Sequence, residues 1–240
     1  MPRFFIDSIN EADIFLDGEN ARHIGRSLRM RTGEKITVCC GGIDYDCEIR
    51  RITEDSVFLD LIEKHQCSAE PTVDVTLFQA VPKLDKLEFI IQKSTELGVS
   101  RVVPVLTRRC ISRPNEKDFA KKLPRLAKIA EEAAKQSGRG KIPEISPIVS
   151  YSECLDMMKN LDKNIILYEG EGGKPFSDVA VEGIKSAGIL IGSEGGFESS
   201  EVEQAVSAGA ERVWLGKRIL RCETAPISAL SILMFLTKNM

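Results

Sequence analysis

GSEGGF at residues 192–197 and LGKRILRCETAP at residues 215–226 each follow a short apolar run. The two runs, AGILI at 187–191 and RVWL at 212–215, are typical of buried strands. Each glycine-containing turn would therefore open at the carboxyl end of a strand. Open α/β sheets hold their ligands at this edge, so the pattern predicts a ligand site late in the chain.

A third turn of the same kind, EGEGG at residues 169–173, follows the strand-like run NIILY at 164–168. Glycine suits such turns because a backbone without a Cβ can adopt positive φ and approach a bound molecule closely. A glycine pair such as Gly195-Gly196 can also serve only to turn the chain. Three glycine turns at three strand ends favour the binding interpretation.

The composition is that of a globular protein with a substantial core. The 240 residues are 42% hydrophobic and 29% charged, which is enough for one large or two smaller domains. The start has no apolar run of signal-peptide length, and the most apolar segment, residues 225–236, is too short to span a bilayer. We expect a cytoplasmic protein.

The seven cysteines include no C-x-x-C pair, and His23 and His65 are far apart in sequence. Neither a disulfide framework nor a metal site is therefore expected. The net charge of −3 is distributed unevenly: residues 1–70 carry nine basic and fourteen acidic side chains, a balance of −5, and residues 101–141 carry twelve and four, a balance of +8. The basic stretch is suited to a polyanion such as nucleic acid.

The first 70 residues are predicted to form a small β-barrel, because apolar or alternating runs at 35–40, 45–52 and 56–62 are separated by turn residues. The segment 17–30 is predicted to be a helix with three arginines on one face, Arg22, Arg26 and Arg29. Guanidinium groups suit phosphate, although a solvated helix face has the same pattern.

The polar segment at 63–72 is the expected linker, with a domain boundary near Glu70. From Val73 onward, strands alternate with helices. Further strands are expected at 73–81, 99–106 and 142–149, and helices at 84–97, 115–138 with a break at Pro124, 152–159 and 225–238. This alternation predicts an α/β fold with a parallel sheet covered by helices on both faces.

Common nucleotide-binding motifs are absent. The chain has neither G-x-G-x-x-G nor G-x-x-x-x-G-K-[ST], and VPKLD at 81–85, after the first strand of the α/β region, has no glycine. This argues against a dinucleotide fold, a P-loop and the common Rossmann-like methyltransferases.

Five ordered motifs carry a resemblance to a known family. They are Arg22-His23 with Leu28-Arg29-Met30-Arg31-x-Gly33, Gln92-Lys93-x-x-Glu96-Leu97-Gly98, Gln136-Ser137-Gly138-Arg139, Ile191-Gly192-Ser193-Glu194-Gly195-Gly196-Phe197, and Leu215-Gly216-x-Arg218-Ile219-Leu220-Arg221-x-Glu223-Thr224-Ala225. Together they resemble the RsmE family, the small-subunit ribosomal RNA uracil-N3 methyltransferases of the SPOUT superfamily. The likeness covers nearly the whole chain.

The resemblance implies a PUA-like β-barrel RNA-binding domain at residues 1–70 and a SPOUT methyltransferase domain at residues 71–240 with a C-terminal trefoil knot. It implies a homodimer that binds S-adenosyl-L-methionine in a bent shape. The implied activity is methylation of N3 of one uridine in the decoding region of 16S ribosomal RNA, within the assembled small subunit, with no metal and no membrane.

The resemblance also assigns site residues. It implies a cofactor pocket formed by Leu167, Gly192, Glu194, Gly195, Gly196, Leu215, Gly216, Ile219 and Leu220. It places four residues near the reacting centre, Glu194, Arg218, Arg221 and Glu223. RNA contacts are expected from Arg22, Arg26, Arg29, Arg108, Arg109 and Arg139. The sequence departs from the family pattern at Ser193, where proline is frequent, and at Cys222, where threonine is frequent, which puts the stiffness of these loops in question.

The residue chemistry agrees with this assignment. Adenosine suits an apolar slot beside glycine turns, which Leu167, Leu215 and Leu220 could supply. Uracil N3 must lose a proton, and Arg218 or Arg221 could stabilise the resulting anion. Which side chain accepts that proton stays open.

Three alternatives are kept. Arg218, Arg221 and Glu223 could form a structural ion-pair cluster. The chain could be a non-catalytic RNA-binding or assembly protein, which binding of S-adenosylmethionine without RNA would exclude. It could also be an α/β enzyme acting on another nucleoside-like substrate, which RNA-dependent turnover would exclude.

Overall fold

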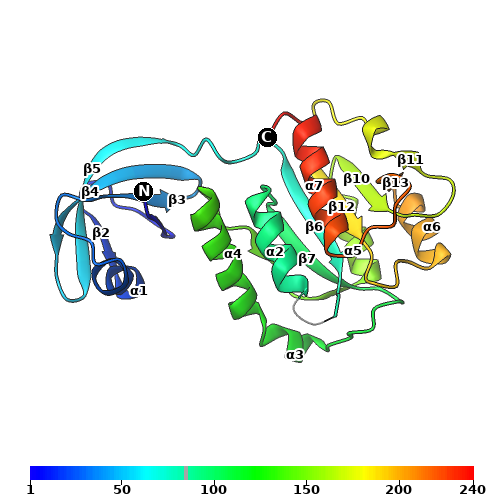
Figure 1. The fold of residues 1–240 in the computed structure, drawn as a ribbon, viewed down its shortest axis with the longest axis horizontal. Coiled ribbons are helices and arrows are strands. Elements are labelled where there is room, and N and C mark those ends of the chain that lie inside the picture. The colour runs from blue at the N-terminus through cyan, green and yellow to red at the C-terminus, as the bar shows by residue number, and fades with distance from the viewer. Residues whose placement is uncertain (84–85) are drawn as a thin grey trace. The chain divides into compact units, whose positions relative to one another are not determined.

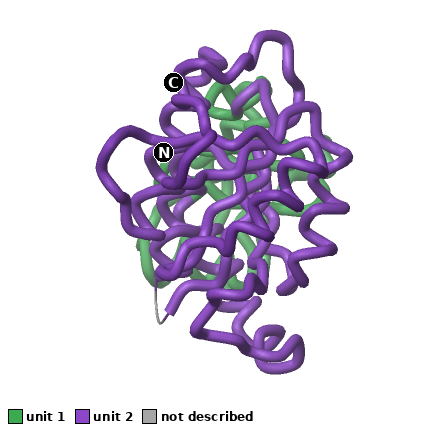
Figure 2. Tube along the Cα trace, turned by 90° about the vertical axis from the view of Figure 1, so that its right-hand side faces the viewer, with its two compact units in different colours: residues 1–70, 134–141 green, residues 71–133, 142–240 purple. Residues whose placement is uncertain are grey.

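The computed structural model describes residues 1–83 and 86–240, and the chain divides into two compact units (Figure 2). The first unit comprises Met1–Glu70 with Ala134–Lys141, and the second comprises Pro71–Ala133 with Ile142–Met240. Each unit has its own apolar core.

The first unit is built on a five-stranded sheet with the order β1-β3-β4-β5-β2. Its strands are β1 (Arg3–Phe5), β2 (Ile14–Asp17), β3 (Lys35–Cys40), β4 (Ile43–Ile52) and β5 (Ser56–Gln66). Alternate side chains such as Ile36, Ile49 and Val57 are completely buried, because successive side chains of a strand point to opposite faces of the sheet. The predicted all-β character is confirmed, although the sequence pattern did not reveal β1 and β2.

The helix predicted at 17–30 is shorter and less regular than expected. Helix α1 (Gly18–Arg22) continues into the π-helical turn η1 (His23–Ser27), and Arg29 follows it with a φ of 52°. A π turn spaces side chains differently from an α-helix, so the regular i, i+4, i+7 face does not form. Arg22, Arg26 and Arg29 are nevertheless all exposed.

The expected linker at 63–72 is partly wrong, because β5 continues to Gln66. After it, Glu70 accepts hydrogen bonds from the Arg139 guanidinium at 2.9 Å and from the backbone N–H of Gly140 at 2.9 Å. Arg139 is only 3% exposed. This buried charge pair explains why a segment distant in sequence belongs to the first unit.

The second unit contains an eight-stranded sheet in which every pairing is parallel, with the order β11-β13-β10-β12-β6-β7-β8 and with β9 also paired to β7. Its strands are β6 (Asp74–Ala80), β7 (Arg101–Leu106), β8 (Glu144–Ile145), β9 (Val149–Ser150), β10 (Lys163–Leu167), β11 (Lys174–Pro175), β12 (Ser186–Ile191) and β13 (Glu211–Trp214). Its helical elements are α2 (Lys86–Glu96), α3 (Glu116–Ala120), α4 (Leu123–Ser137), α5 (Tyr151–Met158), η2 (Phe176–Asp178), α6 (Ser199–Ser207) and α7 (Thr224–Leu236), of which α4 ends in the first unit.

Helices cover both faces of this sheet, as predicted. Ile189 and Ile191 of β12 belong to one core, with residues of α2, α4 and α7, whereas Leu190 between them belongs to a second core with residues of α5 and α6. Figure 1 shows α2 and α7 side by side over the first face. The alternation of side chains along one buried strand thus fills two cores.

Several element boundaries differ from the expectation. The helix predicted at 84–97 begins in the structure at Lys86, and its first two predicted residues lie outside the described residues. Pro124 lies in the first turn of α4, as expected. The strand predicted at 142–149 is two short strands, because Pro143 and Pro147 cannot donate to the sheet. Helix α6 was not predicted, since its capping box is formed by Glu198 and Glu201 without serine or threonine.

Across the residues that the structure describes, no helix is both long and apolar enough to cross a membrane.

Candidate active site

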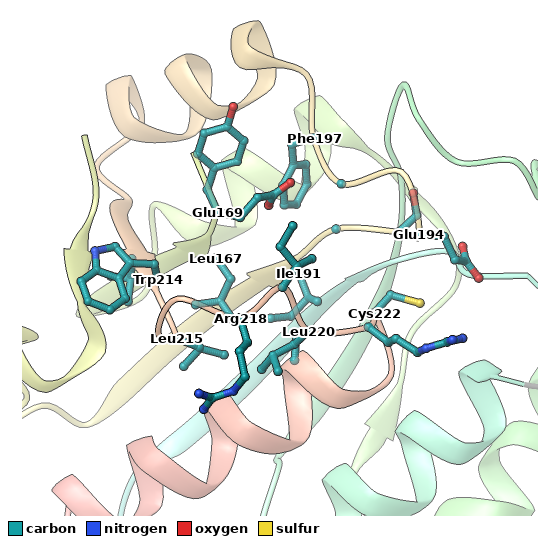
Figure 3. Close-up of a pocket in the computed structure, with 18 of the residues that line it drawn as sticks. Leu167, Glu169, Ile191, Glu194, Phe197, Trp214, Leu215, Arg218, Leu220 and Cys222 are labelled. Atoms are coloured by element: carbon teal, nitrogen blue, oxygen red, sulfur yellow. The ribbon is translucent and has the colours of Figure 1, made fainter. Parts of the chain in front are cut away.

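Three neighbouring parallel strands, β13, β10 and β12, end at the same edge of the sheet. The loops after them enclose a cavity of about 370 Å³ (Figure 3). This volume lies within the range of about 300–1,000 Å³ found for small-molecule sites. The structure thus brings together strand ends that are up to about 50 residues apart in sequence.

One part of the cavity is apolar. Its wall is formed by the ends of the three strands, the loop after β13 and the start of α7. The apolar residues in this wall are Leu167, Ile191, Val213, Trp214, Leu215, Leu220 and Ala225. The remaining lining residues are Lys86, Tyr168, Glu169, Gly192, Ser193, Glu194, Gly196, Phe197, Gly216, Arg218, Ile219, Arg221 and Cys222. An apolar slot bordered by a few polar groups is the composition that suits a nucleoside-sized ligand.

Two features of Gly196 favour glycine at this position. Its φ is 65°, and a Cβ placed on it would lie 3.3 Å from Oε1 of Glu169 across the cavity. A Cβ on Gly192 would lie 3.0 Å from the Cα of Gly196. The glycine loop after β12 therefore folds back on itself so closely that a side chain on Gly192 would press on the backbone of Gly196.

The glycine loop is fixed from outside by the segment after β7. Ser193 Oγ donates to the carbonyl of Arg109 at 3.2 Å, and the Arg109 guanidinium donates to the carbonyl of Gly195 at 3.1 Å. The backbone N–H of Arg108 donates to the buried carboxylate of Glu201 at 2.8 Å. Ser193, one of the two departures from the family pattern, thus contributes a hydrogen bond that proline could not make.

Lys86 joins the loops after two strands. Its Nζ lies 3.2 Å from Oε1 of Glu194 and 3.1 Å from Oε2 of Glu223. The backbone N–H of Lys83 also donates to Glu194, at 3.0 Å. Cys222, the second departure, donates its thiol to Glu223 at a sulfur–oxygen distance of 3.2 Å.

The protonation states of this cluster follow from these contacts. The hydrogen bond to Glu223 raises the pKa of Lys86. Burial opposes ionisation of Glu223, but its hydrogen bonds with Cys222 and Lys86 outweigh burial and lower its pKa. The pKa of Glu194 is lowered in the same way against burial, by backbone N–H groups and Lys86. Burial raises the pKa of the Cys222 thiol to about 12. At neutral pH both carboxylates are therefore ionised beside a lysine cation.

The two predicted arginines, Arg218 and Arg221, line the cavity and are exposed to solvent. Within the described part of the chain, the ion pair of Glu223 is with Lys86, and none joins it to either arginine. The described residues thus do not show the alternative Arg218–Arg221–Glu223 ion-pair cluster, and both arginine side chains are left at the cavity wall and exposed.

Of the expected cofactor-pocket residues, all but one line the cavity. The exception is Gly195, which does not line the cavity. It packs against Arg109 instead, and a Cβ added to Gly195 would lie 3.0 Å from the Cβ of Arg109. The third glycine turn contributes Glu169, which follows Tyr168 at the cavity wall, but its glycines are not among the lining residues. Gly172, for example, packs against the Arg212 guanidinium.

Sequence reasoning missed Lys86, Tyr168, Glu169, Phe197 and Trp214 at the cavity. Tyr168 ends a predicted strand and Glu169 directly follows it, which was the available signal. Lys86 had none, because its role depends on two loops more than 100 residues away in sequence.

The residues expected to contact RNA have different surroundings. Arg108 and Arg109 are exposed, and Arg108 also pairs with Glu198 at 3.0 Å. Arg139 is buried with its guanidinium on Glu70, so it has no surface to offer RNA, and we remove it from the expected set. Among the described residues, no group of three or more His, Cys, Asp or Glu side chains is placed to hold a metal ion.

Comparison with known proteins identifies the family. A family model described as an RNA methyltransferase domain matches residues 69–234, and one described as an RNA methyltransferase PUA domain matches residues 16–62. The chain is 36% identical to ribosomal RNA small subunit methyltransferase E of Bacillus subtilis, over 99% of this chain and 98% of that protein. The chain belongs to the ribosomal RNA small subunit methyltransferase E family.

Other members agree. The protein of the same name from Aquifex aeolicus is 34% identical over 92% of this chain and 93% of its own. The solved structure of the family member from Neisseria gonorrhoeae, bound to S-adenosyl methionine, superposes with a TM-score of 0.87 at 33% identity over 98% of both chains. The resemblance drawn from the sequence motifs is confirmed, and with it the α/β fold preceded by a PUA domain.

Proposed function

We propose that this methyltransferase E family member uses S-adenosyl-L-methionine to methylate N3 of one uridine in the decoding region of 16S ribosomal RNA. The observation that carries the proposal is the cavity at the ends of β13, β10 and β12, which combines an apolar slot with charged residues. The solved relative from Neisseria gonorrhoeae binds S-adenosyl methionine, which supports the same cofactor here. When bound, S-adenosylmethionine supplies an electrophilic methyl group on its sulfonium.

The apolar wall and the glycine loop would hold the cofactor. Leu167, Leu215 and Leu220 form an apolar surface suited to adenosine, and Gly192 and Gly196 bring backbone groups to the same cavity. We propose Glu194, Gly216 and Ile219 as further cofactor contacts, and omit Gly195. Glu169, whose carboxylate faces the loop (Figure 3), is the acidic group best placed for the positively charged cofactor.

The charged residues would act on the uracil. Arg218 and Arg221 supply planar donors that can stabilise the N3 anion through its carbonyl oxygens. Glu194 and Glu223 are both ionised acceptors, held in place by Lys86. Alignment of the nucleophile with the methyl group would account for most of the acceleration.

The RNA would be held by exposed arginines. We propose Arg22, Arg26 and Arg29 of the first unit and Arg108 and Arg109 of the second, because each is exposed and permanently charged. The RNA methyltransferase PUA model at residues 16–62 includes the first three. We place the PUA-like β-barrel domain at residues 1–70 and the SPOUT methyltransferase domain at 71–240.

We further propose a cytoplasmic homodimer with a trefoil knot that acts on the assembled small subunit. Exposed apolar side chains on the adjacent helices α2 and α7 support dimerisation, since Phe89 is 45% and Phe235 is 72% exposed.

Calorimetry with S-adenosylmethionine in the absence of RNA tests the first step. Saturable binding of S-adenosylmethionine that is lost in a variant with a larger side chain in the cavity, such as Gly196→Val, supports the assignment as an enzyme. RNA binding without any cofactor binding would instead identify a non-catalytic RNA-binding or assembly protein.

A further inference from the structure

A row of three side chains crosses the outer face of the first unit's sheet. The strands β4, β5 and β2 are neighbours, and their register places Arg51 opposite Phe58 and Phe58 opposite Phe15. Val57 and Leu59, on either side of Phe58, are buried in the core. Because side chains alternate along a strand, the row faces away from that core.

The three side chains pack on one another in the open. The rings of Phe15 and Phe58 have centroids 6.2 Å apart at an interplanar angle of 36°, and the guanidinium carbon of Arg51 lies 4.2 Å from the centroid of Phe58. Phe15 is 47% exposed. Neighbouring aromatic rings with an arginine are the composition that dominates the energy of protein interfaces.

The charges around this row are mostly acidic. Asp60 lies two residues beyond Phe58 and pairs with Glu48, which is three residues from Arg51 because β4 has a bulge before Arg51. Asp17 lies two residues from Phe15 in the other direction. Asp13 completes the set, and Arg50 partly neutralises it, lying 3.4 Å from Asp13 and 3.5 Å from Asp60. Lys35 of β3 lies opposite Glu48, so the four carboxylates are set against three cations, Lys35, Arg50 and Arg51. The face keeps a net negative charge, which disfavours phosphate, although exposed rings can stack with bases.

We propose that this aromatic–acidic face, formed by Phe15, Phe58, Arg51, Asp17, Glu48 and Asp60, docks a basic segment of a protein partner carried by the small-subunit particle. Apolar stems of lysine or arginine would pack on the rings while their charged ends meet the carboxylates. This surface is separate in residues and opposite in charge from the arginines proposed for RNA. The proposal rests on the proposed function, because it takes the particle as substrate.

Photo-crosslinking tests the nature of the partner. A photoreactive phenylalanine analogue replaces Phe15, and the protein is irradiated with purified small ribosomal subunits. We expect an adduct that survives ribonuclease and contains a peptide rich in lysine and arginine. A ribonuclease-sensitive adduct, or no adduct from a protein that still binds the particles, would overturn the proposal.

Binding measurements with two probes, the purified particles and protein-free 16S ribosomal RNA, give a second test. Phe15→Ser should weaken binding to particles about tenfold and leave binding to free RNA unchanged. Asp17→Lys with Glu48→Lys should also weaken particle binding, whereas an RNA partner would be bound more tightly. The control Ile62→Ser removes a similarly exposed apolar side chain from the neighbouring strand β5, away from the row, and should change neither.

The readouts separate this inference from the function on which it rests. Cofactor affinity and thermal midpoint report whether each variant is folded. Particle binding and methylation that are identical in all variants would overturn only the docking surface. A wild-type protein that neither binds nor methylates particles would overturn the proposed function and the docking surface with it.

Discussion

Replacement of Gly196 by valine is the sharpest test of the cofactor pocket. Gly196 has a left-handed φ of 65°, and a Cβ there would lie 3.3 Å from Oε1 of Glu169. Valine adds two further methyl groups, which must enter the cavity or displace the Glu169 carboxylate. The variant should therefore lose cofactor affinity as well as some stability.

The two effects have separable magnitudes. A left-handed conformation costs a residue with a Cβ about 1–2 kcal/mol. At about 2–4 °C per kcal/mol for a chain of this size, the melting temperature should fall by about 2–8 °C. Overfilling a packed site costs about 1–3 kcal/mol, which corresponds to about a 5- to 150-fold increase in Kd.

Gly183→Val is the matched control. Gly183 has a φ of 73°, and no described atom beyond its chain neighbours lies within 4 Å of an added Cβ. The Gly183→Val variant should show the same decrease in melting temperature without any change in the Kd for S-adenosylmethionine. Calorimetric titration with S-adenosylmethionine and a thermal melt of both variants are sufficient. A folded Gly196→Val protein with wild-type affinity would refute the pocket assignment.

The other predictions concern the charged residues. Lys86→Met removes the cation beside Glu194 and Glu223, so the pKa values of both carboxyl groups should rise. The single-turnover rate of this variant should fall most at low pH and recover as pH increases, while the rate of Lys86→Arg stays near wild type. An equal loss of rate at every pH would contradict this role of Lys86. The wild-type rate should rise through neutral pH, and because the pKa of Glu223 is already lowered, that rise reports the uracil proton. Arg221→Lys should slow the chemical step about tenfold or more with little change in cofactor affinity, and a change in affinity alone would argue against it. Arg22→Glu with Arg26→Glu should flatten the log–log salt dependence of RNA binding by about 0.7–0.9 per lost phosphate contact, and an unchanged slope would identify a solvated face.

Local sequence patterns were sufficient for much of the fold and for one side of the site. The apolar runs that became β10 and β12 are largely buried and β13 is half-buried, so local composition was enough to indicate all three strands, and glycine turns follow their ends. Because parallel strands end at one edge, the strand assignments predicted a ligand site at the glycine loops, whereas the pocket residues Leu167, Gly196 and Leu215 came from the family resemblance.

Tertiary contacts decided what the sequence did not reveal. Arg139 belongs to a basic stretch of the sequence, but in the structure its guanidinium group is buried in an ion pair with the carboxylate of Glu70. Lys86 reads as an ordinary surface lysine of a helix, but the folded chain surrounds it with Glu194 and Glu223. The prediction of one regular helix up to Arg29 was wrong because a π-helical turn follows α1, and the periodicity of residues does not indicate such a turn.

The most direct test of the central claim is methyl transfer followed by nucleoside analysis. The protein is incubated with S-adenosylmethionine carrying a labelled methyl group and with small ribosomal subunits from cells that lack the enzyme, and the 16S ribosomal RNA is digested to nucleosides. The label should be found in 3-methyluridine, and Arg221→Lys should reduce its rate of appearance. Label on a ribose oxygen or another base, or no label in RNA with a protein that binds the cofactor, would contradict the account.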